Sequence, residues 1–197
     1  MTKGAKHMKR IFTGGWMAIC VVVMLAGCIT SLNPTYTEDA LRFDEDLLGA
    51  WKAEQGDSVW TFERDGDMAY RLSYTFGVNK FVYKARLTEL AGHAMLDLEW
   101  NKEASVIASD DIPDALIWDE GHGLVRVLLE PPILYLSFPD PEWFDDYLRD
   151  HPDAVTHRRT TKGIMLTAPT EEVRAFFAEH IDHPDAFRVL PPFHRSP

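Results

Sequence analysis

With 197 residues, of which 46% are hydrophobic, the chain is the right size for one domain that buries its own core. Its 20 basic and 31 acidic residues give a formal net charge of −11. A surface this acidic repels the phosphates of nucleic acids and of anionic lipid head groups. We therefore expect no nucleic-acid partner.

The N-terminus carries a basic stretch followed by an apolar one. Lys3, Lys6, Lys9 and Arg10 precede the apolar run Ile11–Leu25. That run of about 15 residues is shorter than the roughly 20 residues that a membrane-spanning helix needs, and the layout is that of a secretory signal peptide. An uncleaved N-terminal anchor is the alternative.

The apolar run ends on a motif that resembles the lipobox of bacterial lipoproteins, Leu25-Ala26-Gly27-Cys28. The resemblance implies that residues 1–27 are removed as a signal peptide and that Cys28 carries acyl chains, typically palmitate-like, as its membrane partner. More than one chain is what stable anchoring requires. Ile29 stands where an aspartate would retain an enteric lipoprotein in the inner membrane, so the resemblance favours the periplasmic face of the outer membrane.

Removal of residues 1–27 would change both charge and cysteine content. The segment holds four of the basic residues and none of the acidic ones, so the mature net charge would be −15. Cys20 would be discarded and Cys28 acylated, which leaves no free thiol. Disulfides, thiol catalysis and cysteine metal sites are then excluded.

Residues 28–46 are predicted to be a lipidated cysteine followed by a solvated tether, and residues 47–197 a single domain. Asn33-Pro34 breaks regular structure, and five carboxylates keep the segment in water. Fully extended, such a tether spans on the order of 60 Å.

Alternating apolar and polar residues predict an antiparallel meander from Leu47 to about Trp100. Asp65-Gly66 supplies the positive-φ pair that a tight hairpin prefers. Glycine-containing turns also punctuate the next two connections, and Pro131-Pro132 marks a turn between two later strands. The clearest strand candidates are 59–63, 68–75, 81–88, Leu124–Leu129 and Ile133–Phe138.

Residues 101–121 form the longest irregular segment, interpreted as a mouth, a partner-binding patch or another strand. Two amphipathic helices follow. Asp140 is placed to cap the first, which stops at His151-Pro152, and Thr170 to cap the second, which runs to Ile181. Both are expected to pack on the sheet or across a barrel mouth, with a short strand, Gly163–Leu166, between them.

Leu48-Gly49-Ala50-Trp51 resembles the Gly-X-Trp signature of lipocalins and lipocalin-like domains. The C-terminal stretch, with Asp140-Pro141-Glu142-Trp143 and Phe176-Phe177, is similar to secreted bacterial proteins that have lipocalin-like strands and no assigned activity. The resemblance implies a mainly β fold, an antiparallel barrel with two helices packed on it. Because the helices interrupt the strand run, the sequence leaves open whether the barrel is complete or incomplete.

Six aromatic residues at strand spacing either line an apolar pocket or form a packed core. Aromatic residues in this pattern form a packed core more often than they line a ligand site. The six are Trp51, Trp60, Tyr70, Tyr74, Phe81 and Tyr83.

No nucleophile elbow, phosphate loop or metal-ligand spacing occurs in the sequence, so we expect no catalytic residues, no cofactor, no metal and no enzymatic activity. His180 and His183 lie three apart at a helix end, where a histidine also complements the helix dipole. Two functions stay open. One is a lipoprotein that holds an apolar small molecule or lipid, and the other is an interaction or assembly lipoprotein that binds an envelope protein.

Overall fold

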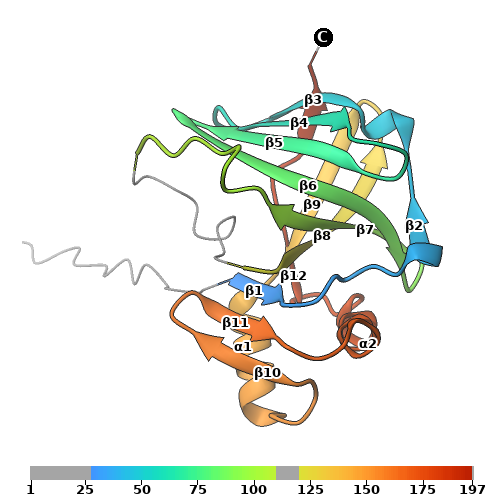
Figure 1. Cartoon of the computed structure of the whole chain (residues 1–197), viewed down its shortest axis with the longest axis vertical. Coiled ribbons are helices and arrows are strands. Elements are labelled where there is room, and N and C mark those ends of the chain that lie inside the picture. Colours follow the sequence, from blue (N-terminus) through green and yellow to red (C-terminus); the bar gives the residue numbers. More distant parts are fainter. Residues whose placement is uncertain (1–27, 110–119, 197) are drawn as a thin grey trace, which may run out of the picture.

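A computed structural model describes residues 28–109 and 120–196 and shows a closed, eight-stranded antiparallel barrel (Figure 1). The barrel closes because β9 (Ile133–Pro139) pairs with β8 (His122–Glu130) on one edge and with β13 (Phe193–Arg195) on the other, and β13 pairs with β3 (Gly49–Ala53). Closure, which the sequence left undecided, therefore depends on a three-residue strand near the C-terminus. The barrel strands are β3 (Gly49–Ala53), β4 (Val59–Arg64), β5 (Tyr70–Phe76), β6 (Asn79–Leu90), β7 (His93–Trp100), β8 (His122–Glu130), β9 (Ile133–Pro139) and β13 (Phe193–Arg195).

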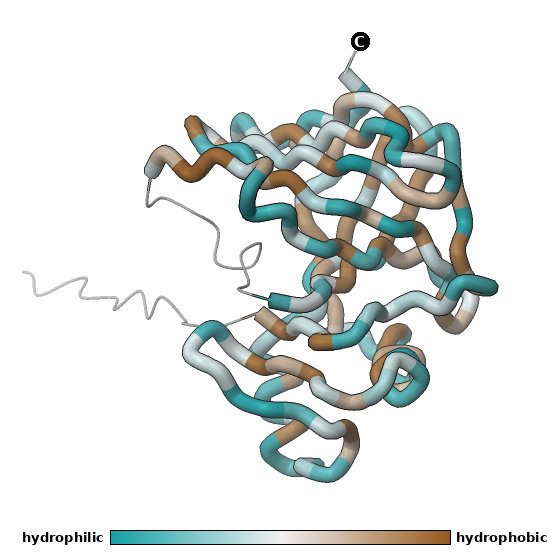
Figure 2. The backbone as a smooth tube through the Cα atoms, in the orientation of Figure 1, coloured by the Kyte–Doolittle hydropathy of each residue, from teal (hydrophilic) through white to brown (hydrophobic). Residues whose placement is uncertain are grey.

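The alternation in the sequence matches the two faces of these strands. Register pairs Trp51 with Trp60, Trp60 with Tyr74, and Tyr74 with Phe81, so one row of rings crosses four neighbouring strands. Directly opposed residues share a face, and this row belongs to the core of the barrel. Figure 2 shows the resulting alternation of hydrophobic and hydrophilic residues along the strands.

The turns agree in part with the sequence prediction. Ala91 and Gly92 join β6 to β7 as a two-residue turn with φ of 48° and 82°, the positive pair that tight hairpins need. The prediction of a tight hairpin at Asp65-Gly66 is wrong: five residues separate β4 from β5, and the Asp65 N–H donates to the carbonyl of Ala69. The predicted turn at Pro131-Pro132 lies between β8 and β9.

A second layer packs on the outside of the barrel (Figure 1). The small strands β1 (Cys28–Ser31), β10 (His157–Thr160) and β11 (Gly163–Leu166) join the barrel where β1 pairs with β8. Helices α1 (Pro141–Asp150) and α2 (Thr170–His180) cover them, and β12 (Phe187–Val189) pairs with β9. This layer has a core of its own, which includes Phe144, Leu148, Ile164, Leu166, Val173, Phe176 and Phe177.

The two helices start differently. The Asp140 carboxylate accepts hydrogen bonds from the N–H groups of Glu142 and Trp143, so the predicted cap of α1 is confirmed. The predicted cap of α2 is wrong: Thr170 is the first helical residue, and Pro169 precedes it without a side-chain cap. The N–H of Val173 bonds instead to the Pro169 carbonyl.

Residues 28–46, predicted to be a tether, are part of the folded domain. They form β1, the short 3-10 helices η1 (Glu38–Ala40) and η2 (Glu45–Leu47), and β2 (Leu41–Arg42), which pairs with β6. Ile29 and Leu41 are buried. The carboxylates stay at or near the solvent while the apolar residues between them pack, and this pattern is too short and irregular to detect in the sequence.

No helix within residues 28–109 and 120–196 is long and apolar enough to cross a membrane. The predicted signal peptide, residues 1–27, lies outside the described residues.

Candidate functional site

The six aromatic residues singled out in the sequence all lie inside the barrel and pack on one another. Each is almost completely shielded from solvent. The ring centroids of Trp60 and Tyr74 are 5.5 Å apart, and those of Tyr74 and Phe81 are 6.0 Å apart. Burial raises the pKa of Tyr70 to about 12 and that of Tyr83 well above its ordinary value. These residues, Trp51, Trp60, Tyr70, Tyr74, Phe81 and Tyr83, belong to the core cluster of the barrel.

An open groove of about 710 Å³ lies along β8 and β9, and its exposed side chains are on the outer face of the barrel. Register places Leu128 opposite Tyr135, and Ser137 opposite both Arg126 and Val189. Leu128 is 54% exposed and Val189 is 56% exposed, so the groove offers apolar surface to solvent.

The polar end of this groove is held in place by the segment that follows α2. The Arg126 guanidinium donates to the carbonyl of Ile181 at 3.0 Å and lies over the ring of Phe187. His93 contacts the Asp182 carboxylate, with 2.9 Å between nitrogen and oxygen. This groove was not predicted from the sequence. Its signal in the sequence was the run of consecutive apolar residues at 127–129, which breaks the alternation of β8.

Cys28, the predicted lipidation site, is partly exposed at the start of β1. It lines a small recess of about 100 Å³ together with residues of the β10–β11 hairpin and with Glu120. The guanidinium of Arg158 contacts both the Glu120 carboxylate and the sulfur of Met165. The residue that would carry acyl chains thus lies on the folded domain itself.

A buried polar cluster fastens the segment after β1 to the barrel. Asp97, fully buried on β7, accepts hydrogen bonds from the backbone N–H and the hydroxyl of Thr35, both at 2.8 Å. Its other oxygen lies 2.8 Å from Nδ1 of His122. Arg174 of α2 donates to the Thr35 carbonyl at 2.8 Å.

This cluster positions the chain and does not resemble nucleophile machinery. Ser31 lies opposite His122 in register, but its hydroxyl donates to the carbonyl of Asn33, so the aspartate–histidine pair does not activate it. Thr35 and Asp97 are 62 residues apart, and no local pattern in the sequence indicates such a contact.

His180 ends α2 and is buried among aromatic rings, with only 7% of its surface exposed. Its ring centroid lies 4.4 Å from that of Tyr147, 5.0 Å from that of Phe176 and 5.3 Å from that of Trp143. Among the described residues, its Nε2 is buried without a hydrogen-bond partner. Burial is the largest effect and lowers the pKa of His180. Glu179 opposes it, and His183 and His151 lower the pKa by smaller amounts.

We expect this histidine to weaken the fold in mild acid. A lowered folded-state pKa means that the unfolded chain, with a histidine pKa near 6.5, binds the proton more readily. The free energy of unfolding should therefore fall as the pH drops below about 6.5, until the folded-state pKa is passed. Urea unfolding between pH 8 and about pH 5 measures this, with His180→Gln showing a flatter dependence than the wild type.

The exposed His194 supplies the control, because His194→Gln should keep the pH dependence of the wild type. Equal slopes for His180→Gln and wild type would contradict the assignment.

No group of three or more histidine, cysteine, aspartate or glutamate side chains in 28–109 and 120–196 is placed to hold a metal ion. The absence of metal, cofactor and catalysis stays a prediction. Residues 110–119 of the irregular segment lie outside the described part. Before them, Val106 forms an isolated bridge with Lys80.

Comparison with known proteins adds no relative: no protein-family model, no curated protein and no solved structure matches this chain.

Proposed function

We propose that this chain is a cell-envelope lipoprotein, held by acyl chains on Cys28 to the periplasmic face of the outer membrane, that acts by binding and not by catalysis. The lipobox-like sequence at residues 25–28 carries the first part of the proposal. The position of Cys28 supports it, since the residue is partly exposed at the start of β1 and lines a surface recess.

The binding partner remains either an apolar molecule or an envelope protein, and the observations favour the protein. The interior aromatics pack as core, which argues against the barrel interior as the ligand site. Apolar side chains are instead exposed on the outside of the barrel, among them Leu128 and Val189 in the groove. A protein partner that covers these side chains would remove apolar surface from water, which favours association.

Native mass spectrometry of the protein, gently extracted from its own membranes, tests both parts. The intact mass should include the acyl chains on Cys28, and a partner in the groove should appear as a larger complex. Leu128→Asp should remove that complex, because a buried, unpaired carboxylate opposes association.

Val78→Asp is the matched control. Val78 is also exposed and apolar, but it lies in the β5–β6 turn away from the groove residues, so the complex should persist. An unmodified Cys28 would overturn the anchoring proposal. A co-purified small molecule that survives Leu128→Asp would shift the function to ligand carriage in another site.

A further inference from the structure

The turn of the β10–β11 hairpin lies beside Cys28. Strands β1 and β11 pair in parallel, and Cys28 is the register partner of Gly163. Neighbouring strands lie about 4.8 Å apart, so Thr161 and Lys162, which form the turn just before Gly163, are close to the cysteine. Figure 1 shows the start of β1 and this turn on the same side of the molecule.

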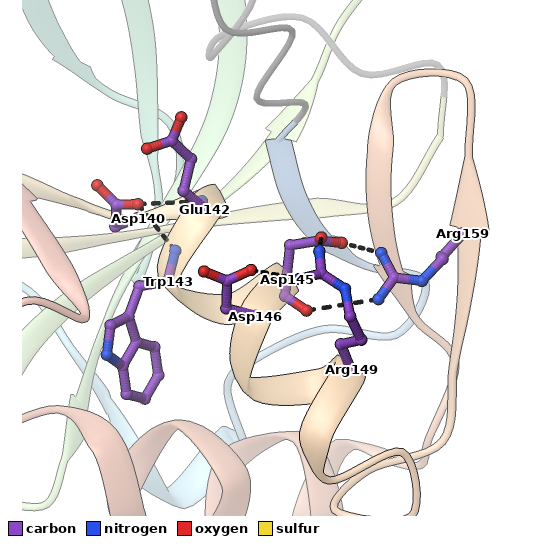
Figure 3. A network of polar contacts seen from close by, with 7 residues as sticks. All are labelled: Asp140, Glu142, Trp143, Asp145, Asp146, Arg149 and Arg159. Atoms are coloured by element: carbon purple, nitrogen blue, oxygen red, sulfur yellow. Dashed lines mark hydrogen bonds and ion pairs between the residues drawn. The ribbon is translucent and has the colours of Figure 1, made fainter.

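The hairpin is held in a defined position. The hydroxyl of Thr160 donates to the carbonyl of Gly163 at 3.1 Å and accepts from the N–H of Lys162 at 3.2 Å. Arg159 reaches from β10 to Asp145 on α1, a carboxylate that Arg149 also contacts (Figure 3). The four-residue parallel pairing of β11 with β1 fixes the hairpin to the body of the domain without needing this ion pair, so the turn moves with the domain.

The hairpin is basic in an acidic protein. Residues 157–163 contain Arg158, Arg159 and Lys162 and no carboxylate, whereas the chain from Cys28 onward carries a net charge of −15. Figure 2 shows β10 as hydrophilic. The acidic partners of the two arginines, Glu120 and Asp145, form solvent-accessible ion pairs, which are weak and exchange readily with other anions.

We propose that the β10–β11 hairpin contacts the lipid head groups of the membrane that anchors Cys28. Arg158 and Arg159, on opposite faces of β10, and Lys162 in the turn would then lie within reach of the phosphates. The inference rests on the proposed lipidation of Cys28. A diacylglyceryl group on the cysteine sulfur places that sulfur at the level of the head groups. Because Cys28 is itself part of β1, no flexible tether separates the bilayer from the domain, and the neighbouring hairpin reaches the same depth.

This contact fixes the orientation of the domain. The acidic remainder of the surface is repelled by anionic head groups, while the basic hairpin next to the anchor is attracted. The domain then has a single preferred orientation on the bilayer instead of rotating freely about the acyl chains.

Site-specific fluorescence on the acylated protein tests the orientation. The mature chain would have no cysteine other than the acylated Cys28, so a new cysteine can be labelled alone. A fluorophore at Thr161→Cys should be quenched several-fold more than one at Asp67→Cys, in vesicles of phosphatidylcholine and phosphatidylglycerol that contain a lipid with a nitroxide head group. Asp67 is exposed in the connection between β4 and β5, which lies away from the hairpin in Figure 1.

Charge neutralisation tests whether the basic residues of the hairpin cause this orientation. Replacing Arg158, Arg159 and Lys162 together with glutamine should remove most of the extra quenching at position 161. Replacing three exposed bases elsewhere, Arg42, Lys52 and Arg71, removes the same charge and should leave the quenching unchanged.

The outcomes separate this inference from the lipidation on which it rests. Equal quenching at positions 161 and 67 in protein whose mass confirms acylation would overturn the orientation and leave the anchor standing, and so would full quenching in the hairpin triple variant. An unacylated mass would overturn both.

Discussion

Cys28→Ser is expected to move the protein from the membrane fraction to the soluble fraction of the cell envelope. The acyl chains supply nearly all of the membrane affinity, because the rest of the mature surface is acidic and the described residues contain no spanning helix. The three basic residues of the hairpin are too few to hold the domain without the chains. Fractionation followed by immunodetection measures the distribution directly.

Cys20→Ser is the matched control for this experiment. Cys20 lies eight positions earlier, in the segment predicted to be removed, so its loss should leave the protein in the membrane fraction. A Cys28→Ser protein that still sediments with membranes would show that Ile11–Leu25 stays in place as an uncleaved anchor.

Trp51→Ala is expected to lower the free energy of unfolding by about 3–5 kcal/mol, a large part of the stability of a typical domain. The ring is completely buried, its Nε1 donates to the carbonyl of Leu47 at 2.8 Å, and the guanidinium of Arg195 lies over it at 4.5 Å. Its register partner in β4 is Trp60. Removal of the ring therefore leaves a cavity where β3, β4 and β13 meet, and denaturant unfolding followed by circular dichroism measures the loss.

Trp100→Ala gives a comparison of equal chemistry at a half-buried position. Trp100 also donates one hydrogen bond, to the hydroxyl of Ser105 at 2.9 Å, but it only partly packs against the barrel core. We expect a clearly smaller loss there. An unchanged melting temperature for Trp51→Ala would contradict the interpretation of Gly49-Ala50-Trp51 as a structural signature of this end of the barrel.

Local patterns in the sequence were sufficient for the strands of the meander and the two helices. Alternation with period two identified the inward rows that contain Trp60, Tyr74 and Phe81, because a half-buried strand must place every second side chain in the core. Asp140 indicated the start of α1 for an equally local reason, since its carboxylate satisfies N–H groups two and three residues later. The lipobox-like motif is likewise contiguous, so the predicted anchor at Cys28 needs no structure.

Only the tertiary structure shows how the strands close into a barrel and which segments distant in the sequence lie side by side. The barrel is completed by Phe193–Arg195, which is too short to show a period and becomes a strand only because β3 and β9 offer unpaired edges. The composition of residues 28–46 predicts a solvated segment. Thr35 of this segment nevertheless hydrogen-bonds to the carboxylate of Asp97, which lies 62 residues later in the chain. The basic hairpin meets Cys28 across 135 residues of chain, through the register of β1 and β11. Contacts of this kind depend on which strand edges remain free after the local elements have formed, and residue periodicity carries no information about that choice.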